Sequence, residues 1–449
     1  MSFGPHGIAT DPESGLKIFI ENTSPLDIVE AEIYDLQKNM AFAELKKIVK
    51  AGPSRELDPE CKLHKICGSC QWQHIKYSEQ LEYKKANLID AFKQNNIDLE
   101  QKKENGELLL DIKVQGLDTP FYFRNKVIYP VQTVKSSGRL LAGYYKTGSN
   151  DLINIKHCPI QYQIFDAIMN EAKALCSQFS IATPLLRHIL LRANLAQTEV
   201  LVSFILRKKL LTANEKRKLK KIFQILIKHF PEIKAATINY NDDSTNVILG
   251  NETELICGEQ DYITDSVKDV KVKISTSSFF QVNNLQFSNI LHSIKSFIAD
   301  AQYKRCLDAY SGIGSISLFL AKNFPSMNFH SFEVNPAAVN NAKENIKLNE
   351  LTNLDTELAS AEEYFQDKQN LDFDIIILNP PRKGCSNKIL ENVTKTNVKT
   401  IIYLSCNPST LARDIKSLEG KGFSLKDIQA FDMFPHTYHL ETLALLKRS

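Results

Sequence analysis

The feature that most constrains the fold is a series of short apolar runs separated by helix-like segments in the last third of the chain. The runs lie at 305–310, 328–334, 374–378 and 400–404, and helix-like segments follow the first two at 316–323 and 336–349. Continuous apolar strands that alternate with helices are typical of a parallel sheet covered on both faces. The sequence therefore predicts a doubly wound, Rossmann-like α/β domain in this part of the chain.

Two further domains are expected before it, because 449 residues exceed one ordinary domain. Residues 1–58 contain strand-like runs with alternating apolar and polar side chains, with turn residues between some of them, which predicts a small OB-like β-barrel. Residues 59–275 mix strand-like and helix-like runs, which predicts an α+β domain. The α/β domain then occupies 276–449.

The charge of the chain is nearly balanced, with 55 basic and 52 acidic residues. Any nucleic-acid binding must therefore come from local basic faces. The basic segment 207–221 is one candidate, although a solvated helix face explains it equally well.

No apolar run approaches the ~18 residues of a membrane span, and residues 1–10 do not resemble a secretory signal. Nine cysteines without disulfide-like spacing suit a reducing compartment, so we expect a cytoplasmic protein. We also expect a monomer without membrane contact.

A glycine loop follows the first apolar run. Gly312 and Gly314 let the backbone pass close to a ligand, and Glu333, nineteen residues after Gly314, ends the next run where an acidic residue can hold ribose hydroxyls. The loop has only G-x-G and no phosphate-binding lysine, which disfavours NAD and ATP. S-adenosylmethionine carries no phosphate, so a shorter loop suffices and this cofactor is predicted. The alternative is a turn whose glycines are only steric.

Two short stretches carry the predicted chemistry: residues 404–408, with Cys406, and residues 439–441, with Glu441. Each is expected to close a strand-like run. Carbon 5 of uracil is a poor nucleophile until a thiolate adds to carbon 6, and a base must later remove the carbon 5 proton. Pro408 ends the strand before it and leaves Cys406 at the carboxyl edge, where α/β sheets bind ligands. A core cysteine is the alternative interpretation.

Asn379-Pro380-Pro381-Arg382 follows another apolar run at the same edge. Asn379 can donate and accept hydrogen bonds to a base edge, and Arg382 can hold a phosphate or stabilise charge on a ring oxygen. This motif also fits an RNA amino-methyltransferase, which would need neither Cys406 nor Glu441. A non-catalytic RNA-binding factor is the third possibility.

A cluster of cysteines lies within the expected central domain. Cys61, Cys67 and Cys70 have ligand-like spacing, and Cys158 completes a set of four. The spacing alone does not distinguish a zinc site, in which a neighbouring histidine can replace a cysteine, from an iron–sulfur cluster. Free core thiols are the remaining alternative.

These motifs together resemble the RNA uracil-5 methyltransferases, specifically the iron–sulfur branch that includes the 23S ribosomal RNA enzymes. The resemblance covers nearly the whole chain and rests on CKLHKICGSCQWQ (61–73), HCPI (157–160), SFFQVN (278–283), SCNP (405–408) and FPHTYHLE (434–441). It implies that residues 1–58 form a TRAM domain that binds RNA. It also implies that Cys406 is the nucleophile and Glu441 the base in the formation of 5-methyluridine.

The resemblance implies further site residues and cofactors. A [4Fe-4S] cluster with a structural and RNA-positioning role would be held by Cys61, Cys67, Cys70 and Cys158. The S-adenosylmethionine pocket would be lined by Gln281, Tyr310, Gly312, Gly314, Ser315, Glu333 and Asn379, with an aromatic residue beside Gln281 near the target base. The family usually has Asp at the position of Asn379, and we interpret the Asn as a variation within the family. The expected substrate is a uridine turned out of structured RNA, with 23S ribosomal RNA favoured and the tRNA T-loop as the alternative.

Overall fold

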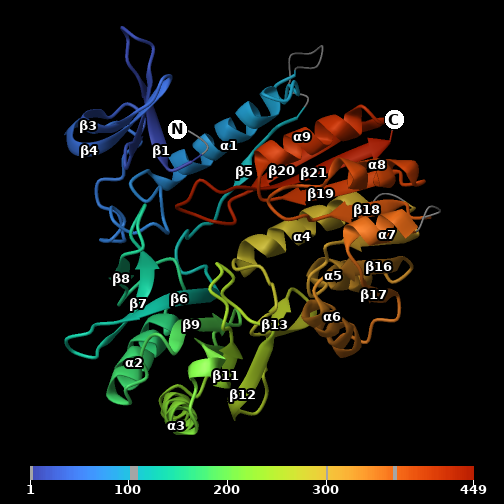
Figure 1. Ribbon diagram of the computed structural model, residues 1–449. Coiled ribbons are helices and arrows are strands. Elements are labelled where there is room, and N and C mark those ends of the chain that lie inside the picture. The colour runs from blue at the N-terminus through green and yellow to red at the C-terminus, as the bar shows by residue number, and fades with distance from the viewer. Residues whose placement is uncertain (1–3, 102–109, 300–301, 368–371, 449) are drawn as a thin grey trace.

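The structure is a computed structural model that describes residues 4–101, 110–299, 302–367 and 372–448 (Figure 1). Within these ranges the strands form one four-stranded, one seven-stranded, one two-stranded and one eight-stranded sheet. None of the helices in the described ranges combines the length and the apolar character that crossing a membrane requires.

The N-terminal sheet has the strand order β1-β2-β4-β3. Its strands are β1 (His6–Thr10), β2 (Lys17–Glu21), β3 (Ile28–Leu36) and β4 (Met40–Lys50). β3 and β4 pair antiparallel, and together they extend away from the rest of the molecule at the upper left of Figure 1. Both faces of β3 are largely exposed, which is unusual for a strand that contains several apolar residues.

The central sheet has the order β12-β11-β10-β9-β6-β7-β8. Its strands are β6 (Lys126–Thr133), β7 (Leu140–Tyr145), β8 (Leu152–Asn154), β9 (Leu186–Ala193), β10 (Val200–Leu206), β11 (Ile233–Tyr240) and β12 (Glu252–Gly258). α2 (Ile164–Gln178) and α3 (Ala213–His229) pack on one face, and β13 (Tyr262–Val267) and β14 (Val270–Ser275) lie on the other.

The basic segment 207–221 lies at the start of α3 and in the short helix η1 (Lys208–Leu210) before it. Thr212 and Glu215 form a capping box that fixes where α3 begins. Lys208 and Lys216 form ion pairs with Glu252 and Glu254 of the neighbouring strand, at 2.6 and 2.7 Å. These pairs neutralise part of the positive charge, so the structure favours the solvated-face interpretation of this segment.

The C-terminal sheet has the order β17-β16-β15-β18-β19-β21-β20-β5. Its strands are β15 (Arg305–Ala309), β16 (Asn328–Glu333), β17 (Leu354–Leu358), β18 (Ile375–Leu378), β19 (Thr400–Ser405), β20 (Phe423–Phe431), β21 (Glu441–Arg448) and β5 (Val114–Gln115). β15 to β19 are parallel, and β21 alone runs antiparallel to its neighbours. The strand order reverses between β15 and β18, and such a switch point is where open α/β sheets bind ligands.

Helices cover both faces of this sheet, as predicted for a doubly wound domain. One face carries α4 (Asn284–Ala299), α5 (Ser315–Asn323) and α6 (Pro336–Leu348). The other carries α7 (Ala361–Asp367), α8 (Asn387–Lys395), α9 (Pro408–Glu419) and α1 (Tyr77–Lys93).

The location of α1 and β5 differs from the expected division between a central domain, 59–275, and a catalytic domain, 276–449. α1 packs against α9, and β5 pairs with β20, so both belong to the C-terminal sheet (Figure 1). Leu88 and Phe92 of α1 are fully buried in that core. The apolar spacing of residues 77–93 correctly indicates a helix with one buried face, but it contains no information about which sheet that face covers.

Candidate active site

The predicted site residues lie around the carboxyl edge of the C-terminal sheet. The loops after β15, β18 and β19 all leave the sheet at this edge, because those strands are parallel. Glu441 was expected to close a strand, and this expectation is wrong: it begins β21. β21 is antiparallel, with Ser405 opposite Thr442, so its first residue lies at the edge where β19 ends. This reversal is what brings Glu441 beside Cys406.

Cys406 lies between the end of β19 and the start of α9. Asn407 caps α9, since its side chain accepts a hydrogen bond from the Ser409 amide at 3.1 Å, and Pro408 occupies the first turn. The proline therefore begins a helix as well as preventing β19 from continuing. Cys406 is partly accessible, as a nucleophile must be. Burial raises the pKa of its thiol, and the nearby Glu441 carboxylate raises this pKa further.

Glu441 is almost completely buried, with 4% of its surface exposed. Burial raises the pKa of its carboxyl to about 8, an effect that Arg382 partly opposes. A carboxyl with such a pKa exchanges protons close to neutral pH, which is the property required of a general acid or base.

Arg382 connects these groups. Its positive charge and its hydrogen bond to Cys406 both lower the pKa of the thiol and so favour the thiolate. The same guanidinium acts on His439, whose pKa is lowered to about 4 by burial and by the charges of Arg382 and Lys84. The sequence indicated Arg382 as a ligand for phosphate or for a ring oxygen, and the structure places it beside the sulfur. His439, two residues before Glu441, was not among the expected site residues, and it is a neutral imidazole in this cluster.

The glycine loop has an unusual backbone conformation, with several residues in the left-handed region. Tyr310, Gly312 and Gly314 all have positive φ, at 62°, 58° and 81°. A side chain added at Gly312 would meet no atom within 4 Å, so the constraint there is conformational and not steric. Ser315 is the first residue of α5, and Gly314 is its N-cap. The N-terminus of α5 therefore directly follows the glycine loop.

Glu333 is tied to this loop by hydrogen bonds. Its carboxylate accepts a bond from the Gly312 amide at 3.1 Å and another from the Asn335 amide at 2.9 Å. Asp308, at the start of the loop segment, is a buried carboxyl that sequence reasoning did not single out. Burial raises its pKa to about 7, and the Ser317 hydroxyl donates a short hydrogen bond to it. No apolar or glycine pattern indicates this pair.

The segment around Gln281 is positioned by the central domain. The side chain of Asn125 donates to the Gln281 carbonyl, and its backbone amide donates to the Val282 carbonyl, both at 2.9 Å. Phe280 is buried, whereas Phe279 is 65% exposed and is the aromatic side chain there that remains available to a ligand. Asn379 directly follows β18 and is half-buried at the switch point.

The four predicted cysteine ligands share one environment. The pKa of Cys70 is raised first by burial and then by the charges of Cys158, Cys67 and Cys61. Burial likewise raises the pKa of Cys158 to about 12. Among the described residues, no three His, Cys, Asp or Glu side chains are arranged to hold a metal ion. The four thiols nevertheless lie close enough for their charges to interact.

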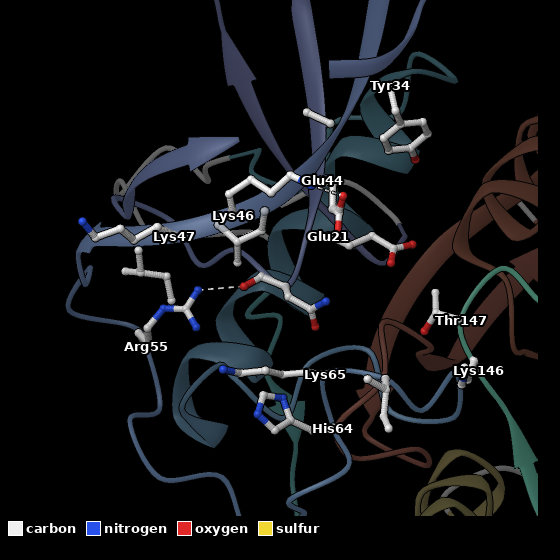
Figure 2. Close-up of a pocket in the computed structure, with 15 residues that line it drawn as sticks. Glu21, Tyr34, Glu44, Lys46, Lys47, Arg55, His64, Lys65, Lys146 and Thr147 are labelled. Atoms are coloured by element: carbon white, nitrogen blue, oxygen red, sulfur yellow. Dashed lines mark hydrogen bonds and ion pairs between the residues drawn. The ribbon is translucent and has the colours of Figure 1, made fainter. Parts of the chain in front are cut away.

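A groove of about 560 Å³ separates the N-terminal sheet from the cysteine loop, which is residues 61–75 (Figure 2). β2, β3 and β4 form one wall, and residues 64–66 with Lys146 and Thr147 form the other. Lys47 and Lys65 line the groove on opposite walls, and within the described part of the chain neither forms an ion pair. Tyr34, at the rim, is 67% exposed. Free ammonium groups with an exposed aromatic ring are typical of surfaces that bind single-stranded nucleic acid.

Comparisons with known proteins agree with this arrangement. A family model described as tRNA (Uracil-5-)-methyltransferase matches residues 144–449. An uncharacterized RNA methyltransferase of Bacillus cereus is 34% identical over 446 residues, which cover 97% of this chain and 92% of that protein. One of Halalkalibacterium halodurans is 32% identical over 442 residues, which cover 96% of this chain and 92% of that protein.

Among solved structures, the Pyrococcus abyssi tRNA (uracil-54, C5)-methyltransferase in complex with S-adenosyl-L-homocysteine superposes with a TM-score of 0.75. The superposition covers 98% of this chain and 100% of that chain, at 24% sequence identity. At this identity the likeness establishes the fold, and it confirms the predicted α/β methyltransferase architecture.

Proposed function

Since the chain belongs to the tRNA (uracil-5-)-methyltransferase family, and is thus an S-adenosylmethionine-dependent RNA methyltransferase, we propose that it methylates carbon 5 of one uridine in 23S ribosomal RNA. The observation that carries the assignment to carbon 5 is the meeting of Cys406, Arg382 and Glu441 at one edge of the sheet, while the choice of 23S ribosomal RNA rests on the motifs shared with the iron–sulfur branch. An enzyme that methylates exocyclic amines would have no use for this combination.

The reaction proceeds through a covalent adduct. The Cys406 thiolate adds to carbon 6 of the uracil, and the electron pair of the 5,6 double bond moves into an enolate. Carbon 5 then attacks the methyl group of S-adenosylmethionine and releases S-adenosylhomocysteine. Glu441 removes the remaining proton from carbon 5, the double bond re-forms, and the thiolate leaves.

The two acidic groups work in sequence because their charges interact. A neutral Glu441 favours ionisation of Cys406, since a negative carboxylate nearby raises the thiol pKa. Once the sulfur is bonded to carbon 6 its charge has moved into the enolate, and transfer of the methyl group from the sulfonium neutralises that charge. Glu441 can then release its proton to solvent and act as the base.

The cofactor is assigned to the pocket around the glycine loop. Glu333 would bind the ribose hydroxyls, and the loop residues Tyr310, Gly312, Gly314 and Ser315 would enclose the adenosyl group. Gln281 and Asn379 would complete the pocket on the side of the target base, with Phe279 stacking on that base. The supporting observation is that Gln281 and Glu333 are both fixed by hydrogen bonds from other segments.

The two N-terminal parts of the chain are assigned to RNA binding. Residues 1–58 would act as the TRAM-like domain, and the groove of Figure 2 would hold RNA that flanks the target uridine. The unpaired ammonium groups of Lys47 and Lys65 would contact phosphates, and Tyr34 would stack on a base.

We expect Lys47→Ala and Lys65→Ala to weaken RNA binding and to lower its salt dependence. Each lost phosphate contact should reduce the slope of log affinity against log salt by ~0.7 for single-stranded RNA. Affinity measured at several salt concentrations tests this, with Lys221→Ala on α3 as the control because Lys221 is an exposed lysine of the basic segment. An equal loss in the Lys221 variant would mean that binding is not localised to the groove.

A [4Fe-4S] cluster on Cys61, Cys67, Cys70 and Cys158 is proposed as a structural element that shapes the loop beside this groove. Methyl transfer requires no electrons, so no step of the reaction passes through it. The proposal rests on the sequence motif and on the shared electrostatic environment of the four sulfurs.

Protein purified without oxygen should be brown and contain about four irons per chain. Cys70→Ser should lose the iron, whereas Cys257→Ser, at a half-exposed cysteine of β12, should keep it. A colourless, zinc-loaded and fully active preparation would contradict the iron assignment.

The tRNA T-loop is a second candidate substrate. The Pyrococcus abyssi enzyme, whose name specifies uracil 54 of tRNA, aligns with 98% of this chain, so the domain architecture alone does not favour ribosomal RNA. Mapping 5-methyluridine in both RNAs from a strain that lacks this protein decides between them. Loss of the modification from one RNA, and its return on re-expression, identifies the substrate. Unchanged modification in both would reject the proposed function.

A further inference from the structure

We propose that Gln80 is a positioning residue for the catalytic base, because it joins the cysteine loop to the loop that carries His439 and leads into Glu441. This inference rests on the proposed function, since it concerns the step that Glu441 performs. The catalytic loop, residues 432–440, connects β20 to β21, and Gln80 lies on α1, far from it in sequence.

The side-chain amide of Gln80 is completely buried and makes four contacts. Its nitrogen donates to the carbonyls of Trp72 and Ile75, at 3.0 and 2.8 Å, and lies 3.3 Å from Nδ1 of His436. Its oxygen accepts a bond from the His436 backbone amide at 3.0 Å. The Trp72 amide in turn donates to the His436 carbonyl at 2.9 Å. One glutamine thus holds both loops at the same point.

The imidazole of His436 has a defined tautomer in this network. Burial and the charge of Lys84 lower its pKa to about 3, so the ring is neutral. Nε2 lies 3.1 Å from the Pro120 carbonyl, which can only accept, so Nε2 carries the proton. Nδ1 is therefore unprotonated and faces the Gln80 amide nitrogen, whose two protons it shares with the Trp72 and Ile75 carbonyls. The ring also stacks on Phe121, with centroids 4.5 Å apart.

The backbone at His436 explains why this loop needs an external anchor. His436 has a φ of 65°, a conformation that costs energy for a residue with a side chain and persists only where its surroundings impose it. Lys84 and Asn283 hold the preceding residues, with bonds to the carbonyls of Phe434 and Met433 at 3.1 Å each. The Gln80 contacts fix the turn itself.

The turn at His436 determines the path of the residues that lead to His439 and Glu441. After His436 the chain runs through Thr437, whose hydroxyl accepts a bond from the His439 amide at 3.2 Å, and then reaches Glu441. β21 fixes the backbone of Glu441, and the loop sets the position of His439, which lies near Arg382, the cation that also acts on Glu441. Release of the turn would therefore impair proton removal from carbon 5 more than attack by Cys406, which lies on a different segment between β19 and α9.

The test uses Gln80→Met, which retains the length of the side chain but removes its donor and acceptor atoms. In single-turnover reactions of the full-length protein with its substrate RNA, we expect methyl transfer close to that of the wild type. Breakdown of the protein–RNA adduct should slow roughly tenfold or more, since small displacements of a catalytic group carry costs of this size. The adduct should then accumulate on denaturing gels. His436→Asn, which tolerates positive φ but lacks the ring contacts, should behave in the same way.

Two controls separate positioning from loss of stability. Phe92→Leu alters the buried face of the same helix against the C-terminal core, and it should lower the melting temperature without causing adduct to accumulate. Glu82→Gln on the exposed face of α1 should change neither. Normal adduct breakdown in Gln80→Met overturns the proposal, as does equal slowing of methyl transfer and breakdown. Absence of any adduct or methyl transfer in the wild type would instead reject the proposed function.

Discussion

Cys406→Ser will abolish methyl transfer to RNA, with a loss on the order of 10⁴-fold or more, as for other enzymes that lose a covalent nucleophile. The hydroxyl of serine does not ionise near neutral pH, and the Arg382 charge that stabilises a thiolate is too weak to change this. Carbon 5 then never acquires the enolate character that it needs to attack a sulfonium. Transfer of labelled methyl groups from S-adenosylmethionine to RNA measures the effect.

RNA containing 5-fluorouracil makes the covalent step visible. Fluorine replaces the proton that Glu441 must remove, so the wild type should form an adduct that survives denaturation. Cys406→Ser should form none, while Cys257→Ser should form as much as the wild type, because Cys257 lies on β12 and away from the active site. Adduct formation by the Cys406 variant would show that another residue attacks carbon 6.

Glu441→Gln will separate the two halves of the reaction. The amide is nearly the same size as the carboxyl but cannot accept the proton, so the methyl group should be transferred once and the protein should remain bonded to the RNA. We expect adduct breakdown to fall by about 10²- to 10⁴-fold, the usual contribution of a general base. The thiol should also ionise more readily, because the carboxylate that raises its pKa is gone.

The pH dependence of adduct breakdown provides an independent measurement. Burial raises the pKa of Glu441 to about 8, so the carboxyl is mostly protonated at lower pH and becomes an active base as the pH rises. The breakdown rate of the wild type should therefore increase through about pH 8, and the residual rate of Glu441→Gln should not. Glu419→Gln on α9 is the matched control. Free turnover in the Glu441 variant would reject this residue as the sole base.

Much of the catalytic domain was predictable because its strands are buried on both faces. The runs at 305–310, 328–334, 374–378 and 400–404 correspond closely to β15, β16, β18 and β19, since continuous apolar sequence is what such strands require. β21 and its direction were not predictable. An antiparallel strand inserted between two parallel ones has the same apolar composition as its neighbours, and the sequence pattern carries no sign of its orientation.

The sequence by itself determined the chemical groups: a thiol before a helix-starting proline, a carboxyl close to the chain end, a glycine loop followed by an acidic residue, and four ligand-like cysteines. These are local signals, fixed by residue type and spacing. The tertiary structure alone decided that β21 reverses and brings Glu441 to Cys406, that burial moves the Glu441 pKa to about 8, and that Arg382 lies at the sulfur. It also placed α1 on the C-terminal sheet and joined two distant loops through Gln80. Such properties depend on which surfaces exclude water together, and that depends on contacts between residues that are far apart in the sequence.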